Sequence, residues 1–218
     1  MNKRVVASLE APGHPKRSSV GGPSAVLLAA GMSSRFSGPK QLAKIGGRTL
    51  VERALDAVPE SVLETVVVLG YEAKAVAASL GGRKGVTVVQ NADYRAGMGG
   101  SIRAGVLAVT DEADGAMILL ADQPFVTRPL LRRMLREFEA RGSRGIVAAS
   151  QGDLVTPPAV FSRKYFAELC DLQGDQGARA VIERHARDVT LVKVRSRRTL
   201  MDVDTRDDLE AARGLLEP

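Results

Sequence analysis

The stretch AVLLAAGMSSRFSGPKQL, residues 25–42, joins an apolar run to a loop of small and basic residues. A continuous run of Ala, Val and Leu is typical of a strand that is buried on both faces. Gly31 follows the run and lets the backbone approach a ligand closely, and successive backbone N–H groups can cradle phosphate oxygens. Arg35 and Lys40 supply two cations nearby. Spacing alone leaves two interpretations open, a phosphate-binding loop and a strand–helix turn with surface charges.

This loop matches neither of the common nucleotide-binding fingerprints. The Walker A pattern fails because Gly31 and Gly38 stand too far apart and Pro39 precedes Lys40. The dinucleotide pattern G-x-G-x-x-G fails because a serine stands two places after Gly31. A nucleotide site at this loop would therefore be of another type.

Apolar runs alternate with amphipathic segments along the following part of the chain. The runs that predict strands are residues 25–30, 65–70, 86–90, 115–122 and 145–150. The amphipathic patterns that predict helices between them are residues 49–58, 72–80, 101–109 and 127–140. Because strands that alternate with helices indicate βαβ units, the sequence predicts a three-layer α/β fold with a mostly parallel sheet.

The two ends of the chain read differently from this middle part. Residues 1–22 are rich in Pro, Gly, Ser and basic residues without periodicity, which predicts a disordered tail. Residues 23–218 are expected to form a single domain, since domains commonly have roughly 100–200 residues. Its last part is expected to contain an extended segment interrupted by prolines (153–161), helices at 163–169, 176–184 and 205–216, and a strand at 189–194.

Composition excludes several classes of function. His14 and His185 are the two histidines, too few for a histidine-rich metal site or a Ser-His-Asp hydrolase, and His185 is expected at a helix end or on the surface. Cys170, the one cysteine, stands in an apolar helical stretch and is expected in the core rather than as a nucleophile. The net charge of +6 is spread along the chain, which favours polyphosphate ligands over nucleic acid.

The sequence also bears on location. The first residues contain no apolar segment of the length that a signal peptide needs. No run approaches the ~18 apolar residues of a transmembrane helix. A cytoplasmic protein without a membrane partner is expected.

Three further stretches carry candidate site residues. In NADYRAGMGGSIRAGV, residues 91–106, three glycines precede Ser101, which is expected to cap the next helix; a base or anion contact and a plain glycine-rich turn are both open. Asp122 follows a buried strand, at the edge where parallel sheets bind ligands, and could hold Mg²⁺. Asp202 and Asp204 alternate on an extended segment, so both could approach one metal, or they belong to a solvated acidic cluster.

Six stretches taken together resemble a known family. In chain order they are LAAGMSSRFSGPKQL, NADYRAGMGGSIRAGV, ILLADQP, TPPAVF, LQGDQGARAVI and MDVDTRDDL. They resemble the molybdenum cofactor cytidylyltransferases, which are related to the molybdenum cofactor guanylyltransferases and to the methylerythritol-phosphate cytidylyltransferases. The resemblance covers about residues 25–216.

The resemblance implies a fold and a reaction. The fold would be a Rossmann-like nucleotidyltransferase fold with a mostly parallel, mixed sheet, its nucleotide-binding part at about 23–125 and its acceptor-binding part at about 126–218. The reaction would transfer CMP from CTP to the terminal phosphate of molybdenum-bound molybdopterin, with Mg²⁺ as cofactor and release of pyrophosphate. A molybdenum hydroxylase apoenzyme is a further implied partner, whereas nucleic acid is not.

The resemblance also implies roles for single residues. The implied catalytic residues are Arg35, Lys40 and Asp122, and the implied metal ligands are Asp122 and Asp204. Ser101 matches the place where related cytidylyltransferases contact cytosine. The implied acceptor side consists of Asp175, Gly177 and Arg179. The implied nucleotide-binding residues are Leu28, Ala29, Ala30, Gly31, Ser34, Arg35, Lys40, Gly99 and Ser101.

One departure and two alternatives accompany the resemblance. The family's loop reads R-x-G-x-x-K, whereas here the Arg35-to-Lys40 spacing is kept but the glycine, Gly38, stands one place later. The path of the loop is therefore open, although the placement of the two cations is not. The first alternative is a guanylyl- or other nucleotidyltransferase that acts on a different small phosphate. The second is a non-catalytic carrier that inserts the molybdenum cofactor into an apoenzyme.

Overall fold

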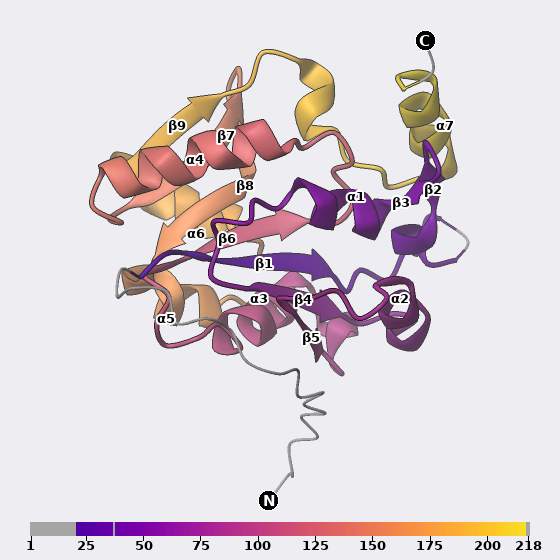
Figure 1. Ribbon diagram of the computed structural model, residues 1–218, viewed down its shortest axis with the longest axis horizontal. Helices are drawn as coiled ribbons and strands as arrows, with labels where there is room; N and C mark the ends of the chain where they lie inside the picture. Colours follow the sequence, from indigo (N-terminus) through magenta and orange to yellow (C-terminus); the bar gives the residue numbers. More distant parts are fainter. Residues whose placement is uncertain (1–20, 37, 217–218) are drawn as a thin grey trace, which may run out of the picture.

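A computed structural model describes residues 21–36 and 38–216 of the chain (Figure 1). The predicted tail, residues 1–22, lies outside the described residues except for its last two. Among the described residues, no helix combines the length and the apolar character needed to cross a membrane.

A seven-stranded mixed sheet forms the middle layer, in the order β5-β4-β1-β6-β8-β7-β9. Neighbouring strands pair in parallel except β8, which runs antiparallel to both β6 and β7. The predicted three-layer α/β fold with a mostly parallel sheet is thus confirmed. The strands are β1 (Ser24–Ala29), β4 (Thr65–Leu69), β5 (Val86–Gln90), β6 (Gly115–Leu120), β7 (Ile146–Gln151), β8 (Leu154–Ser162) and β9 (Val189–Lys193).

Helices cover both faces of the sheet (Figure 1). Residues of α1 (Leu50–Ala57), α2 (Ala73–Ser79) and α4 (Arg128–Ala140) share one buried cluster with one face. Residues of α3 (Met98–Leu107), α5 (Phe166–Cys170) and α6 (Arg179–Arg184) share a second cluster with the other face. Alternate residues of β1 enter the two clusters, which is why its continuous apolar run is a strand between two helical layers.

A third, smaller cluster holds the last helix beside the first loop. It joins Phe36 of the loop to Phe125, Val203 and residues of α7 (Arg206–Gly214). A capping box begins α7, because the Thr205 side chain accepts from the Asp208 backbone and Asp208 accepts from that of Thr205. Segments far apart in sequence are therefore fixed side by side at the right-hand edge of Figure 1.

The structure differs from the sequence prediction at three places. The segment 153–161 is not merely extended: β8 continues through it, and its pairing with β7 skips only the two prolines. A short hairpin of β2 (Lys44–Ile45) and β3 (Arg48–Thr49) was not predicted, although Gly46 and Gly47, both with positive φ, are typical of a two-residue turn. The prediction that Ser101 caps a helix was wrong, because α3 begins three residues earlier with Gly97 at the N-cap position.

Candidate functional site

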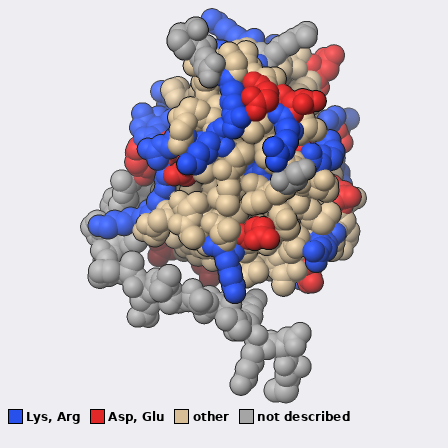
Figure 2. All heavy atoms as spheres, turned by 90° about the vertical axis from the view of Figure 1, so that its right-hand side faces the viewer, with Lys and Arg blue, Asp and Glu red and all other residues tan. Residues whose placement is uncertain are grey.

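A pocket of about 410 Å³ opens where β1 and β6 end, at the carboxyl edge of the parallel strands. Figure 2 shows the molecule from this side, with Lys and Arg side chains gathered around a few acidic ones in its upper half. Most of the predicted site residues line this pocket. They are Leu28, Ala29, Ala30, Gly31, Ser34, Arg35, Lys40, Ser101, Asp122, Asp175 and Asp204.

Three predicted site residues do not line the pocket, and Asp202, whose role was left open, does. The backbone N–H of Gly99 donates to the Gly174 carbonyl at 2.9 Å, so it already has a partner within the protein. Arg179 pairs with Glu183 on the surface of α6. Gly177 lies beside Met98, whose sulfur would be 3.1 Å from an added Cβ. Gly99 and Gly177 therefore adjoin residues at the pocket, whereas Arg179 lies on the surface away from its lining.

The first loop folds back on itself through a buried amide. Ser33 has a positive φ of 55°, and its hydroxyl accepts from the Lys40 backbone N–H at 3.1 Å. Gln41, only 2% exposed, accepts from that hydroxyl at 3.4 Å and donates to the Gly31 carbonyl at 3.0 Å. These three hydrogen bonds fix the path of the first loop, which the shifted position of Gly38 had left open in the sequence.

A loss of stability on substitution of Gln41 is expected from this bonding. Gln41→Leu keeps the side-chain volume but removes both loop bonds, so the free energy of unfolding should fall by about 1–2 kcal/mol. Urea denaturation measures it. The matched control is Gln151→Leu, because the buried Nε2 of Gln151 has no hydrogen-bond partner among the described residues. Equal losses in the two variants would show that the loop bonds contribute nothing specific.

Lys40 is the centre of an ion-pair network inside the pocket. Its Nζ donates to Asp122 Oδ2 at 2.6 Å and to Asp204 Oδ1 at 2.8 Å, and its side chain is only 12% exposed. Arg35, 68% exposed, donates to the other Asp204 oxygen at 2.9 Å. Burial alone would lower the pKa of Lys40, but attraction to Asp122 and Asp204 outweighs it and raises that pKa. Lys40 is therefore cationic at neutral pH.

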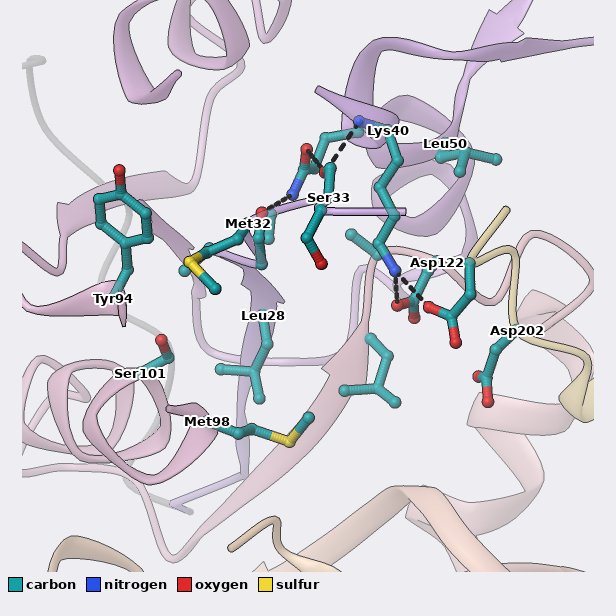
Figure 3. A pocket seen from close by; sticks show the side chains of 18 of the residues that line it. Leu28, Met32, Ser33, Lys40, Leu50, Tyr94, Met98, Ser101, Asp122 and Asp202 are labelled. Atoms are coloured by element: carbon teal, nitrogen blue, oxygen red, sulfur yellow. Dashed lines mark hydrogen bonds and ion pairs between the residues drawn. The ribbon is translucent and has the colours of Figure 1, made fainter. Parts of the chain in front are cut away.

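Two hydrogen bonds tie the segment around Asp202 and Asp204 to the end of β6. The Val203 backbone N–H donates to the Asp122 carbonyl at 2.9 Å, and Gln123 Nε2 donates to Asp202 Oδ1 at 3.1 Å. Burial disfavours the charged form of the Asp202 carboxyl group, and the negative charge of Asp122 adds to this effect. Together they raise the pKa of Asp202 to about 6. Three carboxyl groups thus border one end of the pocket, as Figure 3 shows for Asp122 and Asp202 beside Lys40.

These donors suit a divalent cation. Asp122 Oδ1 is buried and has no hydrogen-bond partner among the described residues, so its lone pairs are unused. Mg²⁺ in proteins is commonly held by one or two carboxylates, with water and phosphate oxygens completing its shell. Within residues 21–36 and 38–216, no three His, Cys, Asp or Glu side chains form a cluster that could hold a metal by themselves. Asp122 and Asp204 would therefore share such an ion with a phosphate-bearing ligand.

The opposite end of the pocket is less charged. Figure 3 shows Ser101 there, beside Leu28, Tyr94 and Met98, and away from Lys40. Ser101 is 5% exposed and accepts a hydrogen bond from the buried amide of Asn91. An apolar wall with a polar hydroxyl suits a flat heterocycle, whereas the charged end suits phosphates.

Close backbone contacts that only glycine allows, at Gly97 and Gly99, bring the segment around Asp175 to the end of the pocket where Ser101 lies. A Cβ on Gly97, whose φ is +112°, would lie 2.1 Å from the Gly174 carbonyl carbon, and one on Gly99 would lie 2.6 Å from the Leu172 oxygen. The start of α3 and the turn before Asp175 therefore pack backbone to backbone. Asp175 thereby reaches the pocket lining.

Sequence reasoning missed three buried amides that support the site: Gln41, Asn91 and Gln123. Each one is 8% exposed or less and bonds a residue that lines the pocket or belongs to its loops. The only local signal was their position directly beside a candidate residue or at a strand end. Cys170 and His185 lie outside the pocket lining, and His185 ends α6 as predicted.

Comparisons of sequence and structure relate this chain to known proteins. The model of the MobA-like NTP transferase domain matches residues 25–189. The nicotine blue oxidoreductase of Paenarthrobacter nicotinovorans is 31% identical over 191 residues, which cover 83% of this chain and 91% of that protein. The molybdenum cofactor cytidylyltransferase of Escherichia coli is 22% identical over 191 residues, covering 86% and 94%.

A solved structure is similar over most of the chain. The crystal structure of Rv0371C in complex with manganese, from Mycobacterium tuberculosis, superposes with a TM-score of 0.71 at 29% identity. The match covers 89% of this chain and 98% of that one. Most of the architecture is therefore shared.

Proposed function

This chain belongs to the MobA-like NTP transferase family, and from this premise we propose that it transfers CMP from CTP to the terminal phosphate of molybdenum-bound molybdopterin, with Mg²⁺ and with release of pyrophosphate. Family membership makes it a nucleotidyltransferase related to the molybdenum cofactor cytidylyltransferases. The nucleotide, the acceptor and the metal are the proposed parts. Because a relative of 31% identity is named an oxidoreductase, the proposal rests on the site rather than on that name.

One observation carries the proposal: two cations and two carboxylates from distant segments meet at one end of the pocket. Lys40 Nζ donates to Asp122 at 2.6 Å and to Asp204 at 2.8 Å, and Arg35 joins this group through Asp204. A carrier protein has no need of such a metal–triphosphate site. We also propose a division of labour within one domain, in which residues 23–125 hold the nucleotide and residues 126–218 bind the acceptor and contribute Asp204.

The proposed reaction needs no nucleophile from the protein. An oxygen of the acceptor's terminal phosphate, already anionic at neutral pH, attacks the α-phosphorus of CTP. The new bond joins that oxygen to phosphorus, and the bond from the α-phosphorus to the bridging oxygen breaks, so that pyrophosphate leaves with the electron pair. Catalysis then rests on positioning and on charge neutralisation. None of the described residues that line the pocket is a histidine, which is compatible with such a mechanism.

Each charged residue has a separate task in this scheme. Arg35 and Lys40 would bind the phosphates that become pyrophosphate, since both extend from the first loop. Asp122 and Asp204 would hold the Mg²⁺, and the manganese complex of the 29%-identical structure supports a divalent ion here. When bound, the ion would supply positive charge to the phosphate oxygens. Asp175 would face the acceptor, with Gly177 and Arg179 supporting its turn.

A nucleotide screen tests the proposal. The protein is incubated with Mg²⁺, with molybdenum-bound molybdopterin and with CTP, GTP, ATP or UTP in turn, and pyrophosphate release is measured. CTP is expected to give the fastest release, and omission of the acceptor should abolish it. A preference for GTP would overturn the choice of nucleotide. No release with any of the four would overturn the proposed activity.

A further inference from the structure

We infer that Asn91 fixes the Ser101 hydroxyl as a hydrogen-bond donor to the nucleotide base, which makes Asn91 a positioning residue for base recognition. The inference rests on the proposed function, because it assigns the base to the end of the pocket that lies away from Lys40 and its two carboxylate partners. It concerns the polarity of one buried contact.

The orientation of the Asn91 amide is fixed by its backbone surroundings. Asn91 follows directly after β5, and its backbone N–H donates to the Leu69 carbonyl at 2.8 Å. Its side-chain Oδ1 accepts from the backbone N–H of Asp93 at 3.0 Å. Of the two polar atoms of the amide, only the oxygen can accept from an N–H, so the amide cannot be turned over without losing this bond. Its nitrogen must therefore point the other way.

The amide nitrogen in turn fixes the role of Ser101. Asn91 Nδ2 lies 3.0 Å from Ser101 Oγ, and this contact is buried. An amide nitrogen can only donate, so the hydroxyl oxygen accepts and its own hydrogen is left for another partner. Among residues 21–36 and 38–216, no acceptor lies in hydrogen-bond geometry to that hydroxyl. Ser101 lines the pocket, so its hydrogen is available to a ligand.

Because the Ser101 hydroxyl can only donate to a ligand, it favours a base that presents a hydrogen-bond acceptor to it. Cytosine carries two neighbouring acceptors, O2 and N3, on one edge. Around Ser101 the pocket offers the apolar side chains of Leu28 and Met98 and the ring of Tyr94 (Figure 3). A base that left the buried hydroxyl unpaired there would bind more weakly, by about 10- to 100-fold. The contact therefore contributes to nucleotide affinity rather than to the chemical step.

The test reverses the polarity without changing the shape. Asn91→Asp is nearly isosteric and keeps an oxygen for the Asp93 N–H, but its second oxygen now accepts from Ser101 and removes the donor from the pocket. Asn91→Asp and Ser101→Ala should therefore weaken CTP binding to a similar extent, about 10- to 100-fold, and raise KM far more than they lower kcat. Binding of CTP with Mg²⁺ is measured by calorimetry, and the thermal midpoints are expected to stay close to that of the wild type.

The double variant Asn91→Asp/Ser101→Ala decides the interpretation. If Asn91 acts through Ser101, the double variant binds CTP no more weakly than Ser101→Ala alone. If the new carboxylate only repels the nucleotide, the two losses multiply, and the inference is overturned. It is likewise overturned if Asn91→Asp binds CTP as the wild type does.

The proposed function and this inference fail separately. Calorimetry needs no acceptor, so the variant series is informative even if the wild type releases no pyrophosphate in the nucleotide screen. If the screen selects another nucleotide, the same series is measured with that nucleotide, whose base must then present an acceptor to Ser101. Loss of activity in the screen with an intact Asn91–Ser101 coupling would reject only the proposed reaction.

Discussion

Asp122→Asn is expected to reduce pyrophosphate release by at least about 10²- to 10³-fold while the chain keeps its fold. The physical reason is the unequal use of the two carboxylate oxygens. Oδ2 pairs with Lys40, whereas Oδ1 is buried and unpaired among the described residues, as a ligand position awaiting a cation would be. An amide of the same shape carries no negative charge and would be a far poorer ligand for Mg²⁺.

The fold should survive because the structural bond at this position belongs to the backbone. The Asp122 carbonyl, not its side chain, accepts from the Val203 N–H that holds the neighbouring segment. Circular dichroism and the thermal midpoint check this. Asp153→Asn is the matched control, since Asp153 is exposed in the turn between β7 and β8, and it should leave the rate unchanged. Near-normal turnover by Asp122→Asn would remove Asp122 from the proposed metal site.

The architecture could be predicted from the sequence because its signals are local. Each parallel strand is a short apolar run between two amphipathic segments, and no knowledge of partners is needed to recognise it. The first loop and Asp122 could likewise be placed at one sheet edge, since parallel strands bring their carboxyl ends together. The start of α3 could not be predicted in this way. Serine is a residue type that commonly caps helices, which favoured Ser101, but the N-cap position is taken by Gly97.

The interior of the site was harder because its bonds join distant residues. Lys40 and Asp204 are 164 positions apart, and Gln123 and Asp202 are 79 apart. In the sequence, a glutamine that is buried and hydrogen-bonded within the protein cannot be distinguished from a glutamine in an exposed turn. Gln41 and Asn91 act over only 10 positions, yet their role depends on which atoms face inward, and that is a property of packing. The ion pairs of Lys40 were absent from the prediction for the same reason, since both aspartates had been assigned only to metal.

Lys40→Met is expected to have two effects of opposite sign. Pyrophosphate release should fall about 10²- to 10³-fold, because a cation that neutralises the leaving phosphates is lost. In the absence of nucleotide, however, the variant should bind Mn²⁺ more tightly than the wild type, roughly 10-fold. The gain follows from position: the Lys40 ammonium lies 2.6 Å and 2.8 Å from the two aspartate oxygens that a divalent ion would need.

In the free protein Lys40 would therefore compete with the proposed metal. Its pKa is raised, so it stays charged, and a divalent ion near it meets like-charge repulsion in a partly buried site. Nucleotide phosphates would relieve this repulsion by giving the ammonium another partner, so metal and nucleotide should each strengthen the binding of the other. The wild type should accordingly bind Mn²⁺ more tightly with CTP present, and Lys40→Met should show a smaller gain from CTP.

Arg35→Met separates this competition from a general effect of charge. Arg35 is 68% exposed and, among the described residues, forms its one ion pair with Asp204, so its loss should raise the affinity for Mn²⁺ in nucleotide-free protein by no more than about 3-fold. Electron paramagnetic resonance of free Mn²⁺ gives both affinities directly. A Lys40→Met protein that binds Mn²⁺ no better than the wild type would show that Lys40 does not occupy the metal's place. A gain confined to Lys40→Met cannot come from damage to the fold, because damage would loosen the aspartates and weaken the ion.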